Sequence, residues 1–414
     1  MDSKQQIRLL AERSRDASRV LAKFDPDKKN MLLRAMADGI ERSVAAIKSA
    51  NAEDLNSGER SGLSSAMLDR LTLTDKRISE MAKGVREVAA LPDPVGTTIS
   101  EWTRPNGIRI QKVRVPIGVI LIIYESRPNV TADAGCLCFK TGNAVILRGG
   151  SEAIHSNLAI AAAMNVPGLP SNSITVVPTT DRAAIDELLK LDDLINLCIP
   201  RGGEGLIRAV AEKSRIPVIK HYNGVCHVYV DRDADFDMAE KIVINAKCQR
   251  PGVCNAIETL LIDEKIAEKF LPRVAKTLTE NKVELRGDDR SRQFVSNAKP
   301  ATEDDWCAEY LDLILAVRVV KDVSEAIDHI AKFGSAHSDA IVTGNKATAE
   351  KFLREVDSSS VFWNASTRLA DGGQYGFGAE IGISTDKIHA RGPMGLEELT
   401  SYKFVVVGDG QVRE

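Results

Sequence analysis

The stretch VPIGVILIIYESRPNVTADAGCLCFKTGNAVILRGGSEA, residues 115–153, decides the fold of this chain. Its first part, residues 115–125, is an apolar run of strand length, and residues 143–148 form a second such run. Between them, residues 127–142 have the length of a helix that Gly142 would close. A strand, a helix and a strand in this order predict a βαβ unit and therefore a parallel sheet.

The same alternation continues on the C-terminal side of this stretch. Strands are predicted at 173–179, 194–200 and 216–222, with helices at 149–165, 181–191 and 201–214. A second series has strands at 257–263, 283–287, 311–320, 338–344 and 359–366, with helices at 264–281, 322–334 and 345–357. The pattern predicts two α/β halves, with a boundary between about residues 220 and 245. Sheets of this kind bind ligands at the carboxyl ends of their strands.

The segments on either side of these series have different patterns. Residues 1–92 carry apolar residues at three- and four-residue spacings, which predicts helices. Alternating runs flank the turn signal RPNG at 104–107 and predict a β-hairpin. Residues 368–384 are rich in glycine, as loops are, and a last strand is expected near the C-terminus.

Length and charge exclude several classes of protein. A chain of 414 residues is expected to form about two or three domains. Its formal net charge of −3 argues against a nucleic-acid partner and against a polybasic membrane-surface protein. No apolar stretch reaches the roughly 18–20 residues of a membrane helix, and the N-terminus lacks a signal-peptide core. We therefore expect a cytoplasmic protein.

One of the seven cysteines has a distinctive position. Cys254 follows the helix-breaking sequence RPG, precedes a predicted buried strand, and lies near the boundary of the two halves. Arg250 could favour its thiolate form and could also hold an anion. Residue type alone leaves open whether Cys254 is a nucleophile or a buried structural cysteine. No C-x-x-C pair is present, so no metal site is predicted.

Two loops repeat a short pattern in which an apolar strand is followed by Arg-Gly-Gly and then a helix. They are Arg148–Gly150 and Arg201–Gly203. Glycines let the backbone approach a phosphate, and a helix N-terminus offers unpaired N–H groups. The alternative is that each Gly-Gly pair only makes a tight turn, and neither loop has the G-x-G-x-x-G pattern.

The segment AKCQRPGVCNAIETLLI, residues 246–262, resembles the catalytic cysteine segment of the aldehyde dehydrogenase superfamily and, within it, of the γ-glutamyl phosphate reductases. Four further segments are similar to the same family, and together they cover almost the whole chain. They are RVPIGVILIIYESRPNVTADA (114–134), NAVILRGGSEA (143–153), AIDHIAKFGSAHSDAI (326–341) and VDSSSVFWNASTRLADGGQYGFGAEIGISTDKIHARGPMGLE (356–397).

The resemblance implies an aldehyde dehydrogenase-like α/β fold with two Rossmann-like parallel-sheet domains and a small β-extension. Residues 1–97 and 115–225 would bind NADP(H), and residues 226–390 would form the catalytic domain with the cysteine nucleophile. Residues 98–114 and 398–414 would form an oligomerisation hairpin and strand, in a homodimer or homotetramer.

The resemblance also implies an activity. L-Glutamate 5-phosphate would be reduced with NADPH to L-glutamate 5-semialdehyde and phosphate, in the second step of proline biosynthesis from glutamate. Cys254 would attack the acyl phosphate, and the thioester would accept a hydride. The upstream glutamate 5-kinase would be a possible partner of the chain.

Site residues are carried over by position. The implied catalytic group is Cys254, Arg250 and Asn255, and the cofactor group is Arg148, Gly149, Gly150, Arg201, Gly202, Gly203 and Glu309. The substrate would meet Arg127, Asn129, Arg368 and Arg391, with Glu380 or Asp371 facing its ammonium group. The backbone N–H of Cys254 is a plausible oxyanion donor. His337 and His389 are interpreted as structural or surface residues.

Two alternative functions remain at this point. One is an NAD(P)-dependent aldehyde dehydrogenase with another substrate. Such relatives hydrolyse the thioester with a glutamate base, but this chain has His221 in the sequence HYNG at that position. We interpret His221 as a polar residue rather than a proton donor. The other alternative is an inactive scaffold, against which the intact sequence QRPGVCN argues.

Overall fold

The computed structural model describes residues 3–413, apart from the side chains of Ser3 and Ala66. The chain forms two compact units. The first contains the chain up to Lys220, the segment Gly376–Gly382 and the chain from Met394 onwards, and the second contains His221–Tyr375 and Ile383–Pro393. The chain therefore first passes from one unit to the other between Lys220 and His221.

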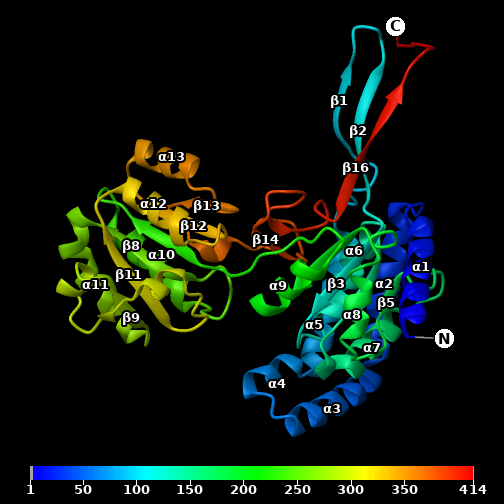
Figure 1. The fold of residues 1–414 in the computed structure, drawn as a ribbon, viewed down its shortest axis with the longest axis horizontal. Coiled ribbons are helices and arrows are strands. Elements are labelled where there is room, and N and C mark those ends of the chain that lie inside the picture. The colour runs from blue at the N-terminus through cyan, green and yellow to red at the C-terminus, as the bar shows by residue number, and fades with distance from the viewer. Residues whose placement is uncertain (1–2, 414) are drawn as a thin grey trace. The chain divides into compact units, whose positions relative to one another are not determined.

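The first unit begins with five helices, as the sequence predicts for residues 1–92. They are α1 (Ser3–Leu21), α2 (Pro26–Arg42), α3 (Val44–Arg60), α4 (Ser65–Leu71) and α5 (Asp75–Ala90). The side chain of Asp25 accepts a hydrogen bond from the Lys28 N–H at the start of α2, and Pro26 occupies the first turn. Thr74 caps α5 in the same way, through the N–H of Arg77. Figure 1 shows these helices in blue.

A four-stranded parallel sheet forms the centre of the first unit. Its strands are β3 (Val119–Tyr124), β4 (Ala144–Arg148), β5 (Ile174–Val176) and β6 (Leu197–Arg201), in the order β5-β4-β3-β6. The helices between and after them are α6 (Val130–Lys140), the short η1 (Ser151–Ala153), α7 (Ile154–Met164), α8 (Ala183–Leu188) and α9 (Glu204–Lys213). Every residue of β3 is buried, and Gly142 follows α6 with φ of 73°. The predicted βαβ unit is confirmed.

The strand predicted at residues 216–222 is wrong. In its place, Val218 forms a single bridge with Cys198. The carbonyl of Pro217 accepts a hydrogen bond from the Cys198 N–H, but proline has no N–H to extend the ladder.

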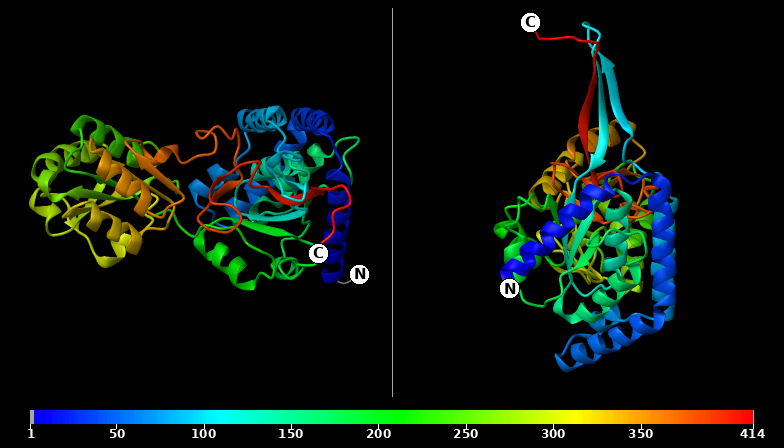
Figure 2. Two further views of the ribbon diagram at one scale, coloured as in Figure 1. Left: turned by 90° about the horizontal axis from the view of Figure 1, so that it is seen from above. Right: turned by 90° about the vertical axis from the view of Figure 1, so that its right-hand side faces the viewer.

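The predicted hairpin is confirmed, and the last strand joins it. Strands β1 (Thr98–Thr103), β2 (Arg109–Pro116) and β16 (Thr400–Val407) form an antiparallel sheet in the order β1-β2-β16. Figure 2 shows this sheet standing away from the helices and the parallel sheet of its own unit.

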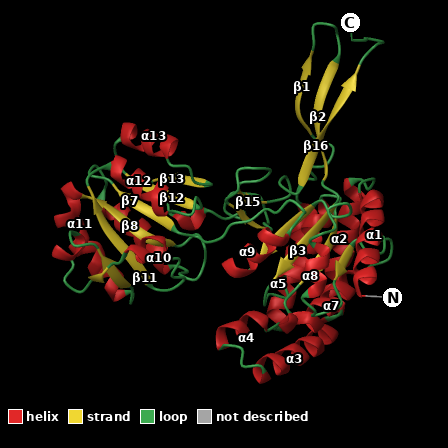
Figure 3. Cartoon of the chain, viewed as in Figure 1, coloured by secondary structure: helices red, strands yellow, loops and turns green. Residues whose placement is uncertain are grey.

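The second unit is built on a seven-stranded sheet in which all strands are parallel, with the order β10-β9-β11-β8-β7-β12-β13. These strands are β7 (Cys226–Val230), β8 (Ile257–Asp263), β9 (Glu284–Gly287), β10 (Lys299–Pro300), β11 (Ile314–Val320), β12 (Ser338–Val342) and β13 (Ser360–Trp363). The helices are α10 (Phe236–Cys248), α11 (Glu264–Glu280), α12 (Val323–Phe333) and α13 (Lys346–Glu355), with short turns η2 (Ser291–Gln293), η3 (Glu303–Cys307) and η4 (Thr367–Leu369). Two further short strands are β14 (Gly382–Ser384) and β15 (Gly392–Met394). Figure 3 distinguishes the helices from the strands.

The sequence prediction missed β7, a fully buried strand of this sheet. It contains His227, a residue that is unusual in a buried strand. The imidazole Nδ1 and the backbone N–H of His227 both contact Oδ1 of Asp339, at 2.7 and 2.9 Å. A partner 112 residues away in the sequence therefore makes this polar residue compatible with the core.

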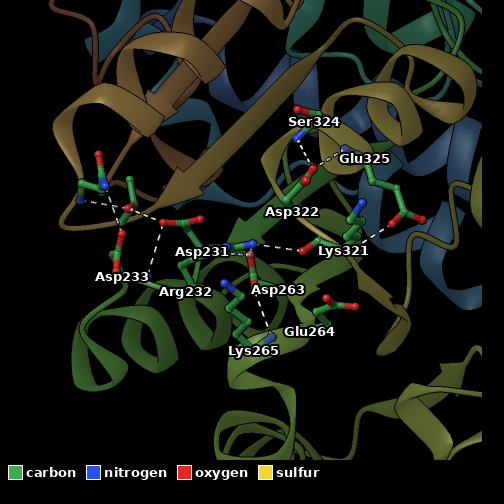
Figure 4. Close-up of polar contacts among 12 residues, drawn as sticks. Asp231, Arg232, Asp233, Asp263, Glu264, Lys265, Lys321, Asp322, Ser324 and Glu325 are labelled. Carbon is green, nitrogen blue, oxygen red and sulfur yellow. Dashed lines mark hydrogen bonds and ion pairs between the residues drawn. The ribbon is translucent and has the colours of Figure 1, made fainter.

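Ion pairs and helix caps fill the carboxyl edge of the second sheet (Figure 4). Arg232 Nε donates to Asp263 Oδ2 at 3.0 Å, and Arg232 also donates to the carbonyl of Lys321. The carboxylate of Asp322 caps α12 by accepting from the N–H groups of Ser324 and Glu325. Cys254 precedes β8 and therefore lies at the opposite, amino edge of this sheet.

Across residues 3–413, every helix is too short or too polar to cross a membrane. In the same range, no group of three or more His, Cys, Asp or Glu side chains is arranged to hold a metal ion.

Candidate active site

The Cys254 loop, residues 249–256, connects the end of α10 to the start of β8. The chain turns sharply after Pro251, and the N–H of Ala256 donates to the carbonyl of Val253 at 3.0 Å. All seven cysteines are thiols, and Cys254 is half-buried. The loop therefore presents one partly accessible thiol at the amino edge of a rigid sheet.

Gly224, which precedes β7, and Cys226, the first residue of β7, pack against Cys254. An ideal Cβ on Gly224 would lie 2.1 Å from the carbonyl oxygen and 2.6 Å from the Cα of Cys254, so residue 224 must be a glycine. The thiol of Cys226 donates to the same carbonyl oxygen, with an Sγ–O distance of 3.2 Å. Burial raises the pKa of Cys226 well above its ordinary value, which keeps it a neutral thiol.

Asn255 ties the Cys254 loop to the segment that contains η4. Its Nδ2 donates to the carbonyl of Ala370 at 2.9 Å, and its own carbonyl accepts from the Thr367 hydroxyl at 2.8 Å. Its Oδ1 accepts from the guanidinium of Arg368. Because Asn255 is only 5% exposed and these bonds occupy its amide, its contacts position the loop.

The Arg368 guanidinium interacts electrostatically with both the Cys254 thiol and Arg250, which belongs to the Cys254 loop. Burial lowers the pKa of Arg368, and the positive charge of Arg250 lowers it further, while Asp371 and Cys254 act in the opposite direction. Arg368 Nε also donates to the Gln249 side chain at 2.9 Å, whereas Arg250 is exposed. Two positive charges near a thiol favour the thiolate and attract an anion. The structure thus brings together four predicted residues: Cys254, Arg250, Asn255 and Arg368.

A neutral histidine lies near this group. Burial, with a smaller contribution from the charge of His221, lowers the pKa of His337 to about 3. The two imidazole rings meet edge to face, with centroids 6.0 Å apart, and His337 Nδ1 lies 3.6 Å from the Cys226 sulfur. His337 is fully buried, in agreement with its interpretation as a structural residue. His389 is exposed, as a surface histidine would be.

In the first unit, the two Arg-Gly-Gly loops lie at the carboxyl edge of the parallel sheet. Arg148 is 6% exposed and donates to the carbonyls of Gly149 and Thr180. A Cβ on Gly149 would lie 2.1 Å from Asn157 Nδ2, and one on Gly150 would meet the carboxylate of Glu152. Side chains of the same loop and of α7 therefore occupy the space beside both glycines. Any contact of Arg148 with a cofactor phosphate stays a prediction.

The second loop already holds a carboxylate. The N–H of Gly203, at the start of α9, donates to Glu125 Oε2 at 3.0 Å. A Cβ on Gly202 would lie 2.3 Å from the same oxygen, whereas one on Gly203 would face open space. Arg201 packs over Gly382. The Glu125 carboxylate is itself an anion, and a cofactor phosphate that replaced it would meet the same N–H group at the start of α9.

The remaining predicted residues are distributed over both units. Arg127 and Asn129 are exposed in the first unit, where Asn129 Nδ2 donates to Asp133 at 2.8 Å. Glu309 is half-buried in the second unit, close enough to Glu258 to raise its pKa.

The three other residues predicted to bind the substrate are Arg391, Asp371 and Glu380. Arg391 pairs with Asp357 at 2.7 Å, so the structure gives it a structural partner. Asp371 accepts from the Gly373 N–H, while Glu380 belongs to the first unit.

Sequence reasoning missed four residues that touch the Cys254 loop or its ends: Gly224, Cys226, Lys247 and Glu258. Lys247 and Glu258 are fully buried and pair at 2.6 Å, with Cys248 and Ile257 between them and the ends of the loop. The only signal in the sequence was their spacing, which places two opposite charges on either side of the RPGVC segment.

Comparisons with known proteins agree with this geometry. The aldehyde dehydrogenase family profile matches residues 1–303. The chain is 60% identical to the γ-glutamyl phosphate reductase of Geobacter metallireducens over 414 residues, or 99% of either protein. The crystal structure of γ-glutamyl phosphate reductase from Thermotoga maritima has a TM-score of 0.97 at 48% identity, covering 99% of this chain and 100% of that one. An engineered glycolyl-CoA reductase with bound NADP⁺ shares the fold, with a TM-score of 0.67 at 15% identity over 97% of this chain and 96% of that one. The predicted fold is thereby confirmed.

Proposed function

The chain belongs to the aldehyde dehydrogenase family and, within it, to the γ-glutamyl phosphate reductases, and from this premise we propose that it reduces L-glutamate 5-phosphate to L-glutamate 5-semialdehyde and phosphate. This is the reductive second step of proline biosynthesis from glutamate. The observation that carries the proposal is Arg368, whose guanidinium interacts electrostatically with both the Cys254 thiol and Arg250 of the same loop. An acyl phosphate is an anionic electrophile that such a group of residues would bind and activate.

The first chemical step is attack by the Cys254 thiolate on the acyl carbon. A carbon–sulfur bond forms, the bond from carbon to the phosphate oxygen breaks, and inorganic phosphate leaves with the electron pair. The exposed guanidinium of Arg250 is suited to the departing phosphate, and the Cys254 N–H to the carbonyl oxygen. Arg368 holds the loop through Gln249 and Asn255, so that the sulfur keeps its direction.

The second step reduces the thioester. A bound nicotinamide cofactor would supply the hydride for this reduction. The carbon–sulfur bond then breaks, the aldehyde forms, and Cys254 recovers its electron pair as a thiolate. Water must not intercept the thioester, and His221 stands where hydrolytic relatives have a glutamate base. A neutral His337 behind it supplies no base either, because burial keeps its pKa at about 3.

We propose NADP(H) as the preferred cofactor. The Gly203 N–H already binds a carboxylate, which supports an anion site for the cofactor diphosphate at Arg201–Gly203. Arg148 would bind the 2′-phosphate by exchanging its hydrogen bond to the Thr180 carbonyl for one to the phosphate. Glu309 would contact the nicotinamide ribose. These residues support the proposal of a dinucleotide, and the positive charge of Arg148 supports a preference for NADP(H).

We also propose a cytoplasmic homo-oligomer in which β16 pairs with a second copy of the chain. Phe404, Val406 and Val407 on this strand are 56%, 58% and 45% exposed, and β16 is at the edge of its sheet. An exposed apolar edge strand is a template for pairing with another chain, and exposed apolar patches often mark interaction sites. Docking with the upstream kinase stays a prediction.

The reverse reaction tests the function because the acyl phosphate substrate is labile. Purified protein should reduce NADP⁺ with glutamate 5-semialdehyde only when phosphate or arsenate is present. Replacing the nucleophile, Cys254→Ser, should abolish this activity, and Cys307→Ser, at an exposed thiol, should leave it unchanged. Activity that survives Cys254→Ser would contradict the assignment of the nucleophile. Oxidation without phosphate or arsenate would support the alternative, an aldehyde dehydrogenase with another substrate.

A further inference from the structure

The Lys247–Glu258 ion pair closes the base of the Cys254 loop. We propose that this pair is a positioning element that fixes Cys254 and the segment carrying Glu309 in one working arrangement; this inference rests on the proposed function. Lys247 is in the last turn of α10, and Glu258 is the second residue of β8. Their side chains are 0% exposed, and Nζ and Oε2 are 2.6 Å apart.

The second carboxylate oxygen of Glu258 reaches a different segment. Its Oε1 accepts from the backbone N–H of Leu311 at 3.3 Å. Leu311 has φ of 53°, a left-handed conformation that is unfavourable for leucine and needs support from its surroundings. On the other side of the same residue, the Leu311 carbonyl lies 3.6 Å from where a Cβ of Gly252 would be. The Glu309 segment therefore lies against the Cys254 loop, and Glu258 holds both.

The aromatic ring of Tyr310 completes this contact. It lies over Lys247, with Nζ 5.9 Å from the ring centroid, and its hydroxyl donates to Asp305 at 2.8 Å. The backbone around Leu311 is thus held by hydrogen bonds and ring contacts on two sides. A shift of the ion pair would move the loop and the Glu309 segment together.

Stability alone does not explain a fully buried ion pair. Desolvation opposes both charges, and well-packed apolar replacements of such pairs are often neutral or stabilising. Burial raises the pKa of Glu258 to about 7 and lowers that of Lys247, which is the expected sign of this cost. The bonds that the pair makes to two functional segments give a reason for its presence that apolar side chains cannot supply.

Two double variants separate the charges from the hydrogen bond. Lys247→Met with Glu258→Gln removes both charges but keeps an acceptor for the Leu311 N–H. Lys247→Met with Glu258→Met removes the acceptor as well. We expect the Met/Met variant to lose about tenfold or more in kcat and to raise KM for NADPH several-fold, because a small misplacement of reacting groups is costly. The Met/Gln variant lacks the ion pair but keeps the bond to Leu311, so its kcat and KM for NADPH should lie between those of the Met/Met variant and the wild type.

A second buried pair provides the matched control. Lys29 and Asp93 in the first unit are also 2.6 Å apart, with side chains 2% and 4% exposed. Lys29→Met with Asp93→Leu should change thermal stability without changing kcat or KM beyond twofold. The rate of Cys254 alkylation by iodoacetamide, measured on each folded protein, reports the loop without turnover. It should fall in the Met/Met variant and not in the control.

These measurements decide whether the Lys247–Glu258 pair positions Cys254 and the Glu309 segment. If the Met/Met variant folds and keeps kcat, KM and the alkylation rate within twofold of wild type, the positioning role is wrong. If it does not fold, Glu258→Asp, which keeps the charge but shortens the reach to Leu311, must raise KM for NADPH, and an unchanged KM would refute the proposal. An inactive wild-type protein would instead contradict the proposed function, whereas the alkylation rates would still test the positioning of Cys254.

Discussion

The backbone of Gly224 lies directly against the backbone of Cys254, with room for a hydrogen atom but not for a methyl group. An ideal Cβ at residue 224 would be 2.1 Å from the Cys254 carbonyl oxygen. We therefore expect Gly224→Ala to displace the Cys254 backbone and so to move its sulfur away from the position needed for attack on the substrate. Since misplacing a reacting group by about 1 Å can cost 100-fold in rate, kcat should fall by about that factor while the protein stays folded. Steady-state kinetics and thermal unfolding would measure both effects.

The matched control is Gly84→Ala, in helix α5, where an added Cβ meets no atom within 4 Å. Alanine is favoured over glycine inside a helix by about 1 kcal/mol, so this variant should keep its activity and gain slightly in stability. Full activity in Gly224→Ala would show that the Cys254 backbone can move without loss, and would refute the explanation.

The two arginines beside Cys254 should form an anion site. Because Arg250 and Arg368 repel each other, a phosphate between them would be favoured. Inorganic phosphate should therefore slow the alkylation of Cys254 in the wild type. In Arg250→Gln this protection should disappear, and KM for phosphate in the reverse reaction should rise roughly 10- to 150-fold, as expected for losing one charge-assisted contact of roughly 1.5–3 kcal/mol.

Arg273→Gln is the control for charge alone, because Arg273 is an exposed residue paired with Asp237 and Glu240 on the helix surface. It should keep the phosphate protection. Equal loss of protection in both variants would mean that net charge, and not a site at Arg250, attracts the anion.

The sequence was sufficient for the features that depend on local pattern. The alternation of strands and helices predicts the βαβ unit around Val119–Tyr124, and RPG followed by an apolar run identifies the Cys254 loop. The missed features depend on partners that are distant in the chain. Strand β7 was missed because His227 is polar, and only Asp339, 112 residues later, allows its burial.

The surroundings of the nucleophile were missed for the same physical reason. Gly224 lies in the segment before β7, and Cys254 lies in the loop before β8. No local sequence pattern indicates that their contact leaves no room for a Cβ at residue 224. Arg368 was predicted as a substrate residue, yet its bonds to Gln249 and Asn255 show that it also holds the loop. That second role comes from tertiary packing, which spacing along the chain does not encode.

The edge strand β16 should control assembly. Phe404 packs edge to face against Trp102, with ring centroids 6.2 Å apart, while 56% of Phe404 remains exposed. Val406→Lys places a charge on the exposed strand, which should oppose pairing with another chain. We expect a lower molar mass by light scattering coupled to size-exclusion chromatography.

Val412→Lys, beyond the strand and 81% exposed, is the control and should keep the wild-type mass. A wild-type monomer, or an unchanged mass in Val406→Lys, would contradict this assembly.

Acid should destabilise the second unit through His337. Burial holds the pKa of His337 at about 3 in the folded protein, against an ordinary value of 6.5. Between these two values the unfolded chain binds a proton that the folded chain does not, so stability is lost as the pH falls from about 6.5 towards 3. One such group contributes a slope of about 1.4 kcal/mol per pH unit to the free energy of unfolding. His337→Gln should reduce the slope by that amount between about pH 6 and 4.

Urea unfolding followed by the fluorescence of Trp306 and Trp363, both in the second unit, would measure this slope at each pH. His389→Asn, at an exposed histidine with φ of 70° that asparagine tolerates, should keep the wild-type slope. An unchanged slope in His337→Gln would mean that His337 takes up its proton in the folded state.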